Sequence, residues 1–580
     1  MNKKLWNIAP QAPSGYIEAL AQQWSTPAQR AALPILAQIL HRRGYNTPEA
    51  ALDFLGEYQQ TTDPFLIKGM EQAVSRLWAA IEQGEPVAVY GDFDCDGVSA
   101  TVLLTEALRR LGAARVYPYI PDRVDEGYGL NSPALKWLAE RGYKVVVTVD
   151  CGIRSVREVE DGNGYGLDII LSDHHSIGPE LPPALAVINP KQAGCPYPEK
   201  MLAGVGLAYK LVQALYIEAE RRGVLPEDGW GPEDWLDLVA IGTVADIAPL
   251  RGENRMLVKR GLERLNQPQR IGLRALYGVA GIRPGAVNTV TIGFVIGPRI
   301  NAAGRLRSAT LAGKLLATED HTQAGKLAQE LNGVNQERQQ KTLQMQEWAE
   351  DGMPTDPSQM PLLFAADSRF EQGVVGLVAS RLTEQYYRPS VVVQVGEHDS
   401  HGSCRSIPEF HITRALDECS DLLERHGGHA AAAGFTVLND NLERLHERLL
   451  GIAEEQLAER ELYPTLAIDA ELSLAECTVD LADALAVLEP CGEANPYPLF
   501  VTRGAIVQRR ALVGSEGRHL KLELADHSGV PVEAIAFRMG EWHDRLPERI
   551  DVVYHLEINE WNGQRRVQLN IQDMRPAENL

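Results

Sequence analysis

The residues of this chain that could do chemistry begin with three aspartates at alternate positions, Asp92, Asp94 and Asp96. They follow an apolar, strand-like run, and Gly97 then opens an expected helix. Carboxylates this close together raise one another's pKa unless a cation lies among them. An oxygen-rich cluster at the end of a buried strand suits a hard divalent ion such as Mg²⁺ or Mn²⁺. A single Asp here would be explained as a helix N-cap, but three at this spacing favour metal binding.

Two later strand-like runs end in side chains of the same kind. One ends in Asp150, and the next ends in Asp173, His174 and His175. Ligands of an open parallel sheet bind outside the carboxyl ends of its strands, so these groups should meet at one place. A fourth acid, Asp246, follows a small apolar stretch, where a helix with a capped turn is the equally simple explanation.

Four motifs resemble, in the same order, those of the DHH phosphoesterase superfamily: Gly91-Asp-Phe-Asp-Cys-Asp-Gly97, Val149-Asp-Cys-Gly152, Ser172-Asp-His-His175 and Gly242-Thr-Val-Ala-Asp246. Six further segments are similar to the RecJ family of that superfamily, a family of single-strand-specific exonucleases: 122–130, 202–206, 297–306, 372–376, 402–406 and 427–434. The resemblance runs from about residue 30 to the C-terminus, and its motifs are long and ordered.

The expected fold class is multidomain α/β. Strand-like runs alternate with helical stretches from about residue 76 to residue 305, which indicates βαβ units and a mostly parallel sheet. Ser390–Val395 is an expected strand of a second α/β part. With the resemblance, the order is an N-terminal helical segment at 1–75, a DHH catalytic domain at 76–306, a connecting helix at 307–350, a DHHA1 domain at 351–462 and an OB-fold domain at 463–580.

The OB-fold is expected because the C-terminal part contains five short runs of alternating polarity. These runs are 504–507, 519–524, 532–537, 550–554 and 567–571. The segment 490–498 before them resembles a Pro-Phe-Gly-x-Gly-Asn-Pro element of the RecJ family. Cys491 and Ala494 depart from that element, and the loss of its second glycine would stiffen the loop.

Two divalent ions, Mn²⁺ or Mg²⁺, held by carboxylates and His could clamp an in-line displacement at phosphorus. We expect Asp150 to bridge the ions, because its strand should be central in the sheet. We expect His175 to donate to a phosphoryl oxygen, and Asp173 either to take part in catalysis or to orient a His. The expected metal ligands, which agree with what the DHH resemblance implies, are Asp92, Asp94, Asp96, Asp150, His174 and Asp246.

A nuclease must also hold a phosphate away from the scissile one, and Arg is suited to bidentate phosphate capture. The RecJ resemblance implies a pocket for the DNA 5′ phosphate, which would give 5′→3′ polarity. In family members a His often precedes the segment 372–376, but this chain has Glu371, so no role is assigned to that position. The expected DNA-binding and 5′-phosphate-binding residues are Arg123, Arg299, Arg305, Ser403, Arg405 and His429.

The composition is that of an ordinary globular protein, with 44% hydrophobic and 23% charged residues. The net charge of −22 argues against non-specific coating of duplex DNA, but not against a local basic channel. No apolar run approaches a membrane span, and the N-terminus lacks the apolar core of a secretory signal. Seven scattered cysteines without a CxxC pair are typical of reduced, cytoplasmic thiols.

The function expected from these residues and the resemblance is a metal-dependent exonuclease that hydrolyses single-stranded DNA 5′→3′ to mononucleotides in recombination and repair. The family implies a single-strand binding protein and a helicase as partners, and no membrane partner is expected. One alternative is a DHH oligoribonuclease or nucleotide phosphatase, against which the expected C-terminal barrel argues. The other is a non-catalytic DHH replication scaffold, against which the complete set of acids and His argues.

Overall fold

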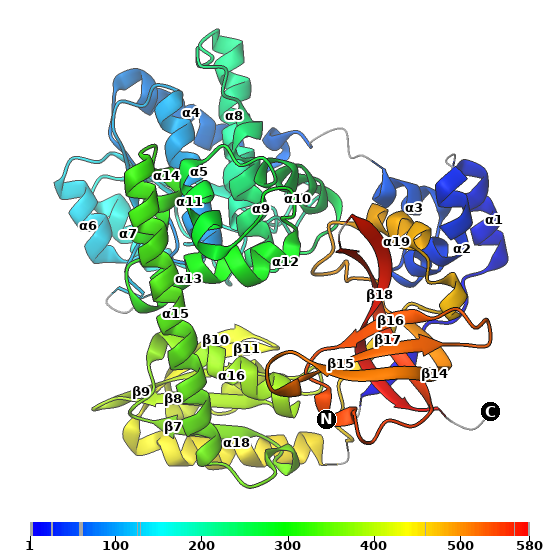
Figure 1. Cartoon of the computed structure of the whole chain (residues 1–580). Coiled ribbons are helices and arrows are strands. Elements are labelled where there is room, and N and C mark those ends of the chain that lie inside the picture. Colours follow the sequence, from blue (N-terminus) through cyan, green and yellow to red (C-terminus); the bar gives the residue numbers. More distant parts are fainter. Residues whose placement is uncertain are drawn as a thin grey trace. The chain divides into compact units, whose positions relative to one another are not determined.

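The structure is a computed structural model that describes residues 4–577, except 25–26, 57–61, 124–125, 128, 459 and 562. The chain divides into two compact units (Figure 1). Unit 1 contains Met1–Gln60, Pro249–Gly252 and Tyr463–Leu580, and unit 2 contains Thr61–Ala248 and Glu253–Leu462. Each unit is described separately below.

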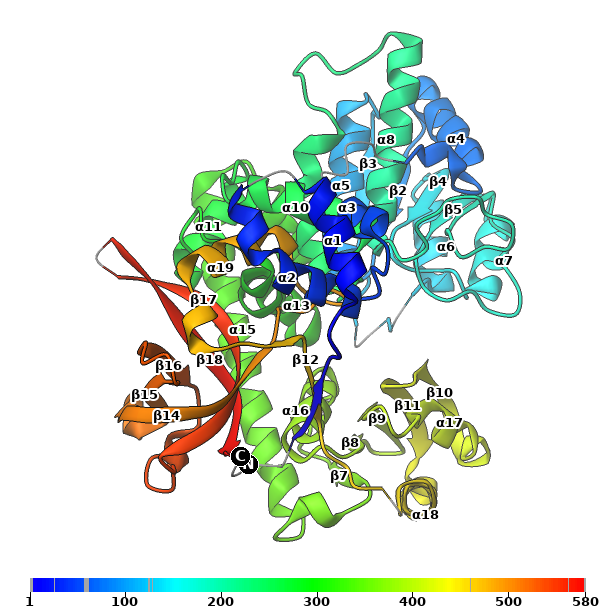
Figure 2. The ribbon, with the colours of Figure 1, turned by 90° about the vertical axis from the view of Figure 1, so that its right-hand side faces the viewer.

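The first part of unit 2 is built on a five-stranded parallel sheet, as the alternating pattern predicts. Its strands β2, β4 and β5 are rich in Val and Ile and almost wholly buried, which is typical of a sheet covered on both faces. The central strand is β4, and Figure 2 shows β3, β2, β4 and β5 side by side. The strand order is β3 (Val116–Tyr119), β2 (Val87–Tyr90), β4 (Val145–Thr148), β5 (Asp168–Ser172) and β6 (Ala186–Ile188).

Helices cover both faces of this sheet (Figure 2). On one face α6 (Ser132–Glu140) and α7 (Val156–Gly164) bury apolar side chains against β2, β4 and β5. On the other face α5 (Cys95–Arg110) contacts α8 (Gly204–Arg222), and α4 (Met70–Gln83) lies beside α8. These helices fix the directions in which the strand ends present their side chains.

The remaining helices of unit 2 join this sheet to a second one. The helix α9 (Leu236–Ala245) lies against α5 and α8. The long helix α15 (His321–Asp351) contacts α13 (Gly297–Leu306) and α14 (Thr310–Ala317) and then α16 (Gln372–Tyr386), so it connects the two sheets (Figure 1). The expected connecting segment is therefore helical, but it contains the separate helix α14. The others are α10 (Gly252–Leu265), α11 (Ile271–Ala280), α12 (Thr289–Thr291), α13 (Gly297–Leu306) and α14 (Thr310–Ala317).

The second sheet of unit 2 is mixed. Its strand β8 spans Ser390–Val395, the range predicted from the sequence. One face packs against α15 and α16 (Gln372–Tyr386), and the other packs against α17 (Ile412–Asp417) and α18 (Leu442–Leu457). The strand order is β10 (Leu423–His429), β11 (Ala432–Leu438), β9 (Asp399–Arg405), β8 and β7 (Leu363–Asp367), and only β7 and β8 are parallel.

Unit 1 contains a closed five-stranded barrel, so the predicted OB-fold is confirmed. The pairing of β14 (Phe500–Val513) with β17 (Arg549–Trp561) closes it, and β13 (Ala470–Glu471) pairs with β14. Each of the five predicted runs falls on one barrel strand. The strands are β14 (Phe500–Val513), β15 (His519–Ala525), β16 (Val532–Ala536), β18 (Gln564–Pro576) and β17 (Arg549–Trp561).

The N-terminal segment belongs to this barrel unit. The strand β1 (Leu5–Ile8) pairs in parallel with β12 (Thr465–Ile468), and one hydrophobic core combines residues from positions 12–54 with residues from positions 472–574. Leu250, in the short inserted segment, donates its N–H to Glu493 O at 2.8 Å. The helices of this core are α1 (Ser14–Gln23), α2 (Pro27–Arg42), α3 (Pro48–Leu55) and α19 (Val479–Leu485).

Candidate metal centre and phosphate pocket

Three neighbouring strand ends deliver the acids and histidines to one place, as predicted from the sequence. The turn after β2 carries the three aspartates, β4 leads to Asp150, and β5 leads to His174 and His175. The fourth acid, Asp246, is the C-cap of α9. Three sets of candidate ligand atoms, each within 4.8 Å of one another, are formed by Asp92, Asp94 and Asp150; by Asp96, His174 and Asp246; and by Asp150, His174 and His175.

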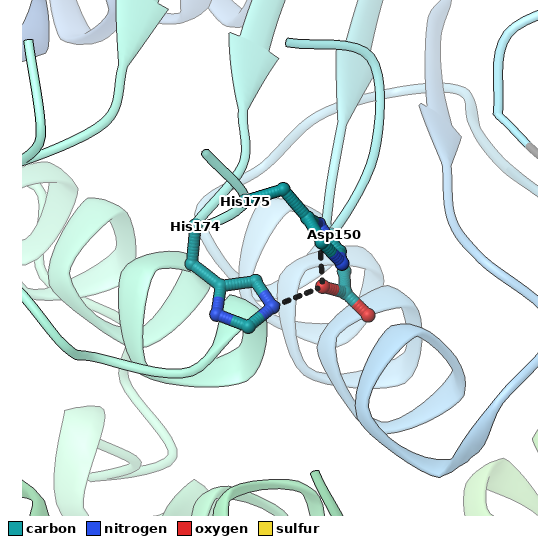
Figure 3. A group of neighbouring side chains, drawn as sticks. All are labelled: Asp150, His174 and His175. Atoms are coloured by element: carbon teal, nitrogen blue, oxygen red, sulfur yellow. Dashed lines mark ion pairs between the residues drawn. The ribbon is translucent and has the colours of Figure 1, made fainter. Parts of the chain in front are cut away.

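Asp150 and His174 each belong to two of these three sets, so they link the sets to one another. Oδ1 of Asp150 lies 3.1 Å from Nε2 of His174 and 4.0 Å from Nδ1 of His175 (Figure 3). The backbone of Asp150 has φ +66°, a left-handed conformation that non-glycine residues adopt mainly where the surrounding structure imposes it. Asp150 is thus a buried carboxylate shared by two sets of candidate ligands.

Asp96 is held by the N-terminus of α8. Its carboxylate accepts hydrogen bonds from the backbone N–H groups of Gly204, at 2.7 Å, and Val205, at 2.8 Å. The positive end of the helix dipole stabilises a carboxylate at this point. Gly204 is required for the close approach, because a Cβ there would lie 2.5 Å from Asp150 Oδ1.

The helix-cap explanation for the first motif is also realised in the structure. Asp94 is the N-cap of α5, and its Oδ1 accepts from the backbone N–H groups of Asp96, at 2.9 Å, and Gly97, at 3.0 Å. Asp94 also belongs to one of the three ligand sets. Capping and metal binding are therefore compatible roles of this one carboxylate, which has a second oxygen.

The buried polar atoms of the cluster fit a divalent cation. Asp92 Oδ1, Asp150 Oδ1 and His174 Nε2 are buried and have no hydrogen-bond partner among the described residues. Burial, and then the neighbouring carboxylates, raise the pKa of Asp92 and of Asp150 above the usual range. Without a cation, this arrangement of buried carboxylates is electrostatically unfavourable. Two divalent cations would neutralise the carboxylates and would take their oxygens and the imidazole nitrogen as ligands.

The two histidines have different surroundings. Asp173 accepts hydrogen bonds from Ile153 N, His175 N and His175 Nδ1, so it orients His175. Burial lowers the pKa of His175, but the bond to Asp173 and the nearby carboxylates outweigh it and raise that pKa overall. Burial and the charge of His175 lower the pKa of His174 to about 3, so His174 is neutral, as a metal ligand must be.

A group of arginines lies next to these acids. Arg123, beyond β3, lies near Asp92 and Asp94, and its guanidinium stacks over the ring of Phe93 at 4.9 Å. Burial lowers the pKa of Arg305 to about 9, and the charges of three other arginines contribute. No carboxylate of the described residues forms an ion pair with any member of this arginine cluster, Arg123, Arg305, Arg338 and Arg405.

The second sheet supplies the other side of the arginine cluster. Arg405, at the end of β9, donates to Ser403 Oγ at 3.2 Å. Arg305 of α13 donates to Gly373 O, in the first turn of α16, at 3.1 Å. A Cβ at Gly376 would lie 3.0 Å from Ser403 Oγ and 3.3 Å from the guanidinium of Arg405, so α16 also passes close to these side chains. These residues form a concentrated positive site that suits a phosphate.

Two expected DNA-binding residues lie further out. Arg299 donates to Asn332 Oδ1, at 3.1 Å, and to Val295 O, at 2.8 Å, and its charge reaches Arg338. His429 stands at the end of β10 and is paired through Ala432 of β11 with Arg405 of β9. His429 and Arg405 therefore lie two strands, or about 9.6 Å, apart at the same register.

Three family models match the chain: the DHH family N-terminal domain at residues 86–243, the DHHA1 domain at 359–456 and the RecJ OB domain at 468–573. The single-stranded-DNA-specific exonuclease RecJ of Bacillus subtilis is 38% identical over 550 residues, covering 94% of this chain and 68% of the relative. That of Escherichia coli is 34% identical over 571 residues, covering 94% of this chain and 96% of the relative. The chain belongs to the RecJ family.

Solved structures of RecJ agree with this assignment. The crystal structure of RecJ from Thermus thermophilus in complex with Mn²⁺ matches with a TM-score of 0.83 and 32% identity, covering 99% of this chain and 80% of that one. The complex of the same protein with Mg²⁺ matches with a TM-score of 0.78 and 30% identity, covering 99% and 79%. The RecJ fold is thus shared over nearly the whole of this chain.

The departures from the RecJ pattern have visible settings. Glu371 is the N-cap residue of α16 and forms an ion pair with Lys341 at 2.8 Å. Ala494 has φ +58°, a conformation that a glycine would adopt without strain. Val124, Asp125 and Tyr128, in the RecJ-like segment 122–130, lie outside the described residues.

Three residues near the site were not found from the sequence. Arg338 of α15 joins the arginine cluster, and its Nε is buried without a partner among the described residues. Asn189 and Lys191 follow β6 and contact the backbone of the His pair. The turn after β6 also lies at the carboxyl end of a strand of this sheet. It contains no acid or His, so the sequence did not mark it as part of the site.

Within the described part of the chain, no helix is both long and apolar enough to cross a membrane. All seven cysteines lie in the described part of the chain, where they are buried and form no disulfide.

Proposed function

We propose that this chain is a metal-dependent exonuclease that degrades single-stranded DNA from its 5′ end to mononucleotides. The observation that carries this proposal is the position of the arginine cluster directly beside the acids and histidines. Burial lowers the pKa of Arg123, and the charges of Asp92 and Asp94 counteract this effect. Burial also lowers the pKa of Arg305 and of Arg405, and the charge of Arg123 adds to this effect. A terminal phosphate held by the arginines would bring the next phosphodiester to the acids, and the membership of the RecJ family supports the same reaction.

When bound, two Mn²⁺ or Mg²⁺ ions would supply an activated water and stabilise the leaving oxygen. The residues proposed to hold them are Asp92, Asp94, Asp96, Asp150, His174 and Asp246, with Asp150 as the bridge. Asp173 fixes Nδ1 of His175, which leaves Nε2 of that ring for a phosphoryl oxygen. Asp173 acts through His175 in this proposal, so its role is positioning.

Arg123, Arg305, Ser403 and Arg405 are proposed to bind the 5′ phosphate, and Arg299 and His429 to contact the strand nearby. The guanidinium groups match phosphate oxygens in pairs, which fixes the end of the strand as well as its charge. Recognition of the end gives 5′→3′ polarity without any reading of the bases. We propose the five ranges expected from the sequence as the domain organisation of the chain.

The setting proposed for this activity is cytoplasmic DNA recombination and repair. Seven buried cysteines that form no disulfide among the described residues support a reducing compartment. A single-strand binding protein and a helicase are proposed as partners, because an enzyme restricted to single strands needs another protein to expose them.

The test uses long single-stranded DNA labelled at the 5′ or the 3′ end, with Mn²⁺, for wild type and Asp150→Ala. We expect mononucleotides to appear first from the 5′ label with wild type and not to appear with the variant. Arg405→Met should lower the preference for a 5′-phosphorylated over a 5′-hydroxyl strand and leave Mn²⁺ binding intact. Release from the 3′ label would contradict the proposed polarity.

The same assay separates the rival functions. Hydrolysis confined to oligonucleotides of a few residues would indicate an oligoribonuclease, and phosphate release alone would indicate a nucleotide phosphatase. Absence of any metal-dependent hydrolysis by folded protein would favour the scaffold.

A further inference from the structure

The turn after β6 lies beside the turn that carries the His pair. β6 is the neighbour of β5 in the parallel sheet, so its carboxyl end lies next to the residues that follow β5. Asn189 is the first residue after β6 and is fully buried, and Lys191 is two residues further on. Neither residue belongs to the metal-binding or phosphate-binding sets described above.

Two side chains of this turn hold two consecutive carbonyl groups of the His pair. Asn189 Nδ2 donates to His175 O at 3.0 Å. Lys191 Nζ donates to His174 O. The two side chains are also tied together, because Asn189 Oδ1 accepts from the backbone N–H of Lys191 at 2.9 Å. Asn189 therefore uses both ends of its amide, so its orientation is fixed.

The turn itself is fixed to β6 by hydrogen bonds of Gln192. Gln192 Nε2 donates to Val187 O, in β6, at 2.7 Å, and Gln192 N donates to Asn189 O at 3.2 Å. Asn189 and Lys191 thus connect the His pair to a turn that is fixed to β6 by hydrogen bonds. A site held through a rigid element keeps its ligand geometry, whereas a site on a loop loses it easily.

The position of Lys191 is unusual for a lysine. No carboxylate of the described residues forms an ion pair with it, and the acceptor of its ammonium group is the carbonyl of His174. Its charge lies near Asp173 and Asp246, on the side of the cluster where His174 Nε2 approaches Asp246 Oδ2 at 3.6 Å. The lysine can therefore fix the backbone and balance part of the local negative charge together.

We propose that Asn189 and Lys191 are positioning residues that hold the backbone of His174 and His175 for metal binding and catalysis. With both carbonyls held, His174 Nε2 stays directed at Asp150 and Asp246, and His175 stays within reach of Asp173. Without them, the turn can rotate while the fold remains intact. The catalytic part of this inference rests on the proposed function, and the metal-binding part does not.

The test compares wild type with Lys191→Met, Lys191→Arg and Asn189→Asp. Met removes the donor and the charge, Arg keeps both, and Asp keeps the acceptor for Lys191 N but loses the donor to His175 O. Lys200→Met is the matched control, because Lys200 Nζ donates to Pro190 O, at 2.9 Å, and Cys195 O, at 2.8 Å, and so stabilises the same loop without contacting the His pair.

Free Mn²⁺ is measured by electron paramagnetic resonance, unfolding by calorimetry, and kcat and KM on 5′-phosphorylated single strands. We expect Lys191→Met and Asn189→Asp to weaken Mn²⁺ binding and to lower kcat by about 10-fold or more, the effect usual for groups that orient metal ligands. KM should change little, because the arginine cluster is intact. Lys191→Arg should recover most of both losses, and Lys200→Met should lower only the unfolding temperature.

Wild-type Mn²⁺ affinity in Lys191→Met would overturn the inference, and so would an equal loss of Mn²⁺ affinity in Lys200→Met. If Asn189→Asp fails to fold, the comparison of Met with Arg at position 191 decides. Wild type that binds Mn²⁺ but hydrolyses no strand would contradict the proposed function, while a weaker Mn²⁺ affinity in Lys191→Met would still support the positioning role.

Discussion

At the scale of single residues, Asp150 combines the features that define the site. Its carboxylate is shared by two sets of candidate ligands, and its backbone adopts a left-handed conformation. Burial and then the charge of Asp96 raise its pKa, so the cluster without metal is electrostatically unfavourable. This repulsion lowers the stability of the metal-free protein, and bound cations relieve it. A change that removes the repulsion should therefore stabilise the metal-free protein and weaken metal binding.

The variant Asp150→Asn tests that opposition. The amide has nearly the same shape and tolerates a left-handed backbone, but it cannot carry the charge. We expect loss of exonuclease activity and a higher unfolding temperature than wild type in EDTA, because one source of repulsion is removed. Calorimetry with EDTA and with Mn²⁺ measures both effects, and a lower unfolding temperature in EDTA would contradict this account.

The acids also predict the direction of the pH dependence of metal binding. Burial and Asp94 raise the pKa of Asp96 to about 7, and burial and Asp96 raise that of Asp246 to about 9. These carboxyl groups hold protons near neutral pH, and Mn²⁺ must displace them. Apparent Mn²⁺ affinity should therefore rise from about pH 6 to about pH 8. Titration calorimetry in buffers of different ionisation enthalpy should detect released protons, and the same heat in every buffer would refute the prediction.

At the scale of residues, the sequence predicted those parts of the site whose side chains bind metals by their chemical type. The spacing of Asp92, Asp94 and Asp96 and the pair of histidines were sufficient to predict the cluster. Asn189, Lys191 and Arg338 were missed because their importance depends on which strands and helices become neighbours. No sequence motif distinguishes an Asn or Lys that donates a hydrogen bond to a backbone carbonyl from any other Asn or Lys.

At the scale of elements, the N-terminus of α8 determines how closely the acids can approach one another. It supplies two N–H groups to Asp96 and passes against Asp150 at Gly204. The sequence analysis found a RecJ-like segment at 202–206, but it could not predict that the N-terminus of α8 would meet the acids. That depends on the order of the strands, which is a property of the whole sheet.

Two glycines of α8 provide a matched pair of variants. A Cβ at Gly204 would lie 2.5 Å from Asp150 Oδ1, whereas a Cβ at Gly206 would meet Leu202 at 3.5 Å, an ordinary contact. We expect Gly204→Ala to abolish activity and to weaken Mn²⁺ binding strongly. Gly206→Ala should keep both and could stabilise the helix by up to about 1 kcal/mol. Activity assays and Mn²⁺ titrations of the two variants check this, and equal behaviour would show that α8 does not set the site.

At the scale of the whole molecule, unit 1 combines residues 1–60 with residues 463–580, and unit 2 contains most of the residues between them. Composition does not indicate this division. The N-terminal helices were predicted as a small separate piece, but they share a core with the C-terminal barrel. The barrel strands themselves were predicted well, since alternating polarity is a local signal. Which distant segments complete a core is a long-range property, and periodicity carries no information about it.

Leu36→Ala tests the independence of the two units. Leu36 of α2 is fully buried in the core of unit 1, and its truncation should cost about 2–5 kcal/mol there. Mn²⁺ stabilises only the unit that binds it. In calorimetry we expect the variant to lower a transition that Mn²⁺ does not shift, with normal Mn²⁺ affinity. A lowered transition that Mn²⁺ does shift would mean that the units unfold together.

The shared core of unit 1 also bears on how the protein is made. The segment 12–54 leaves the ribosome before unit 2, whereas its apolar partners at 472–574 leave after unit 2. Unit 2 lies between these two segments in the chain and can complete its own cores before residues 472–574 are made. Until then, the apolar side chains of the segment 12–54 stay exposed. A nascent chain that stops before residue 463 would keep those side chains exposed, and it would therefore be a substrate for chaperones and for the proteases that remove unfinished proteins.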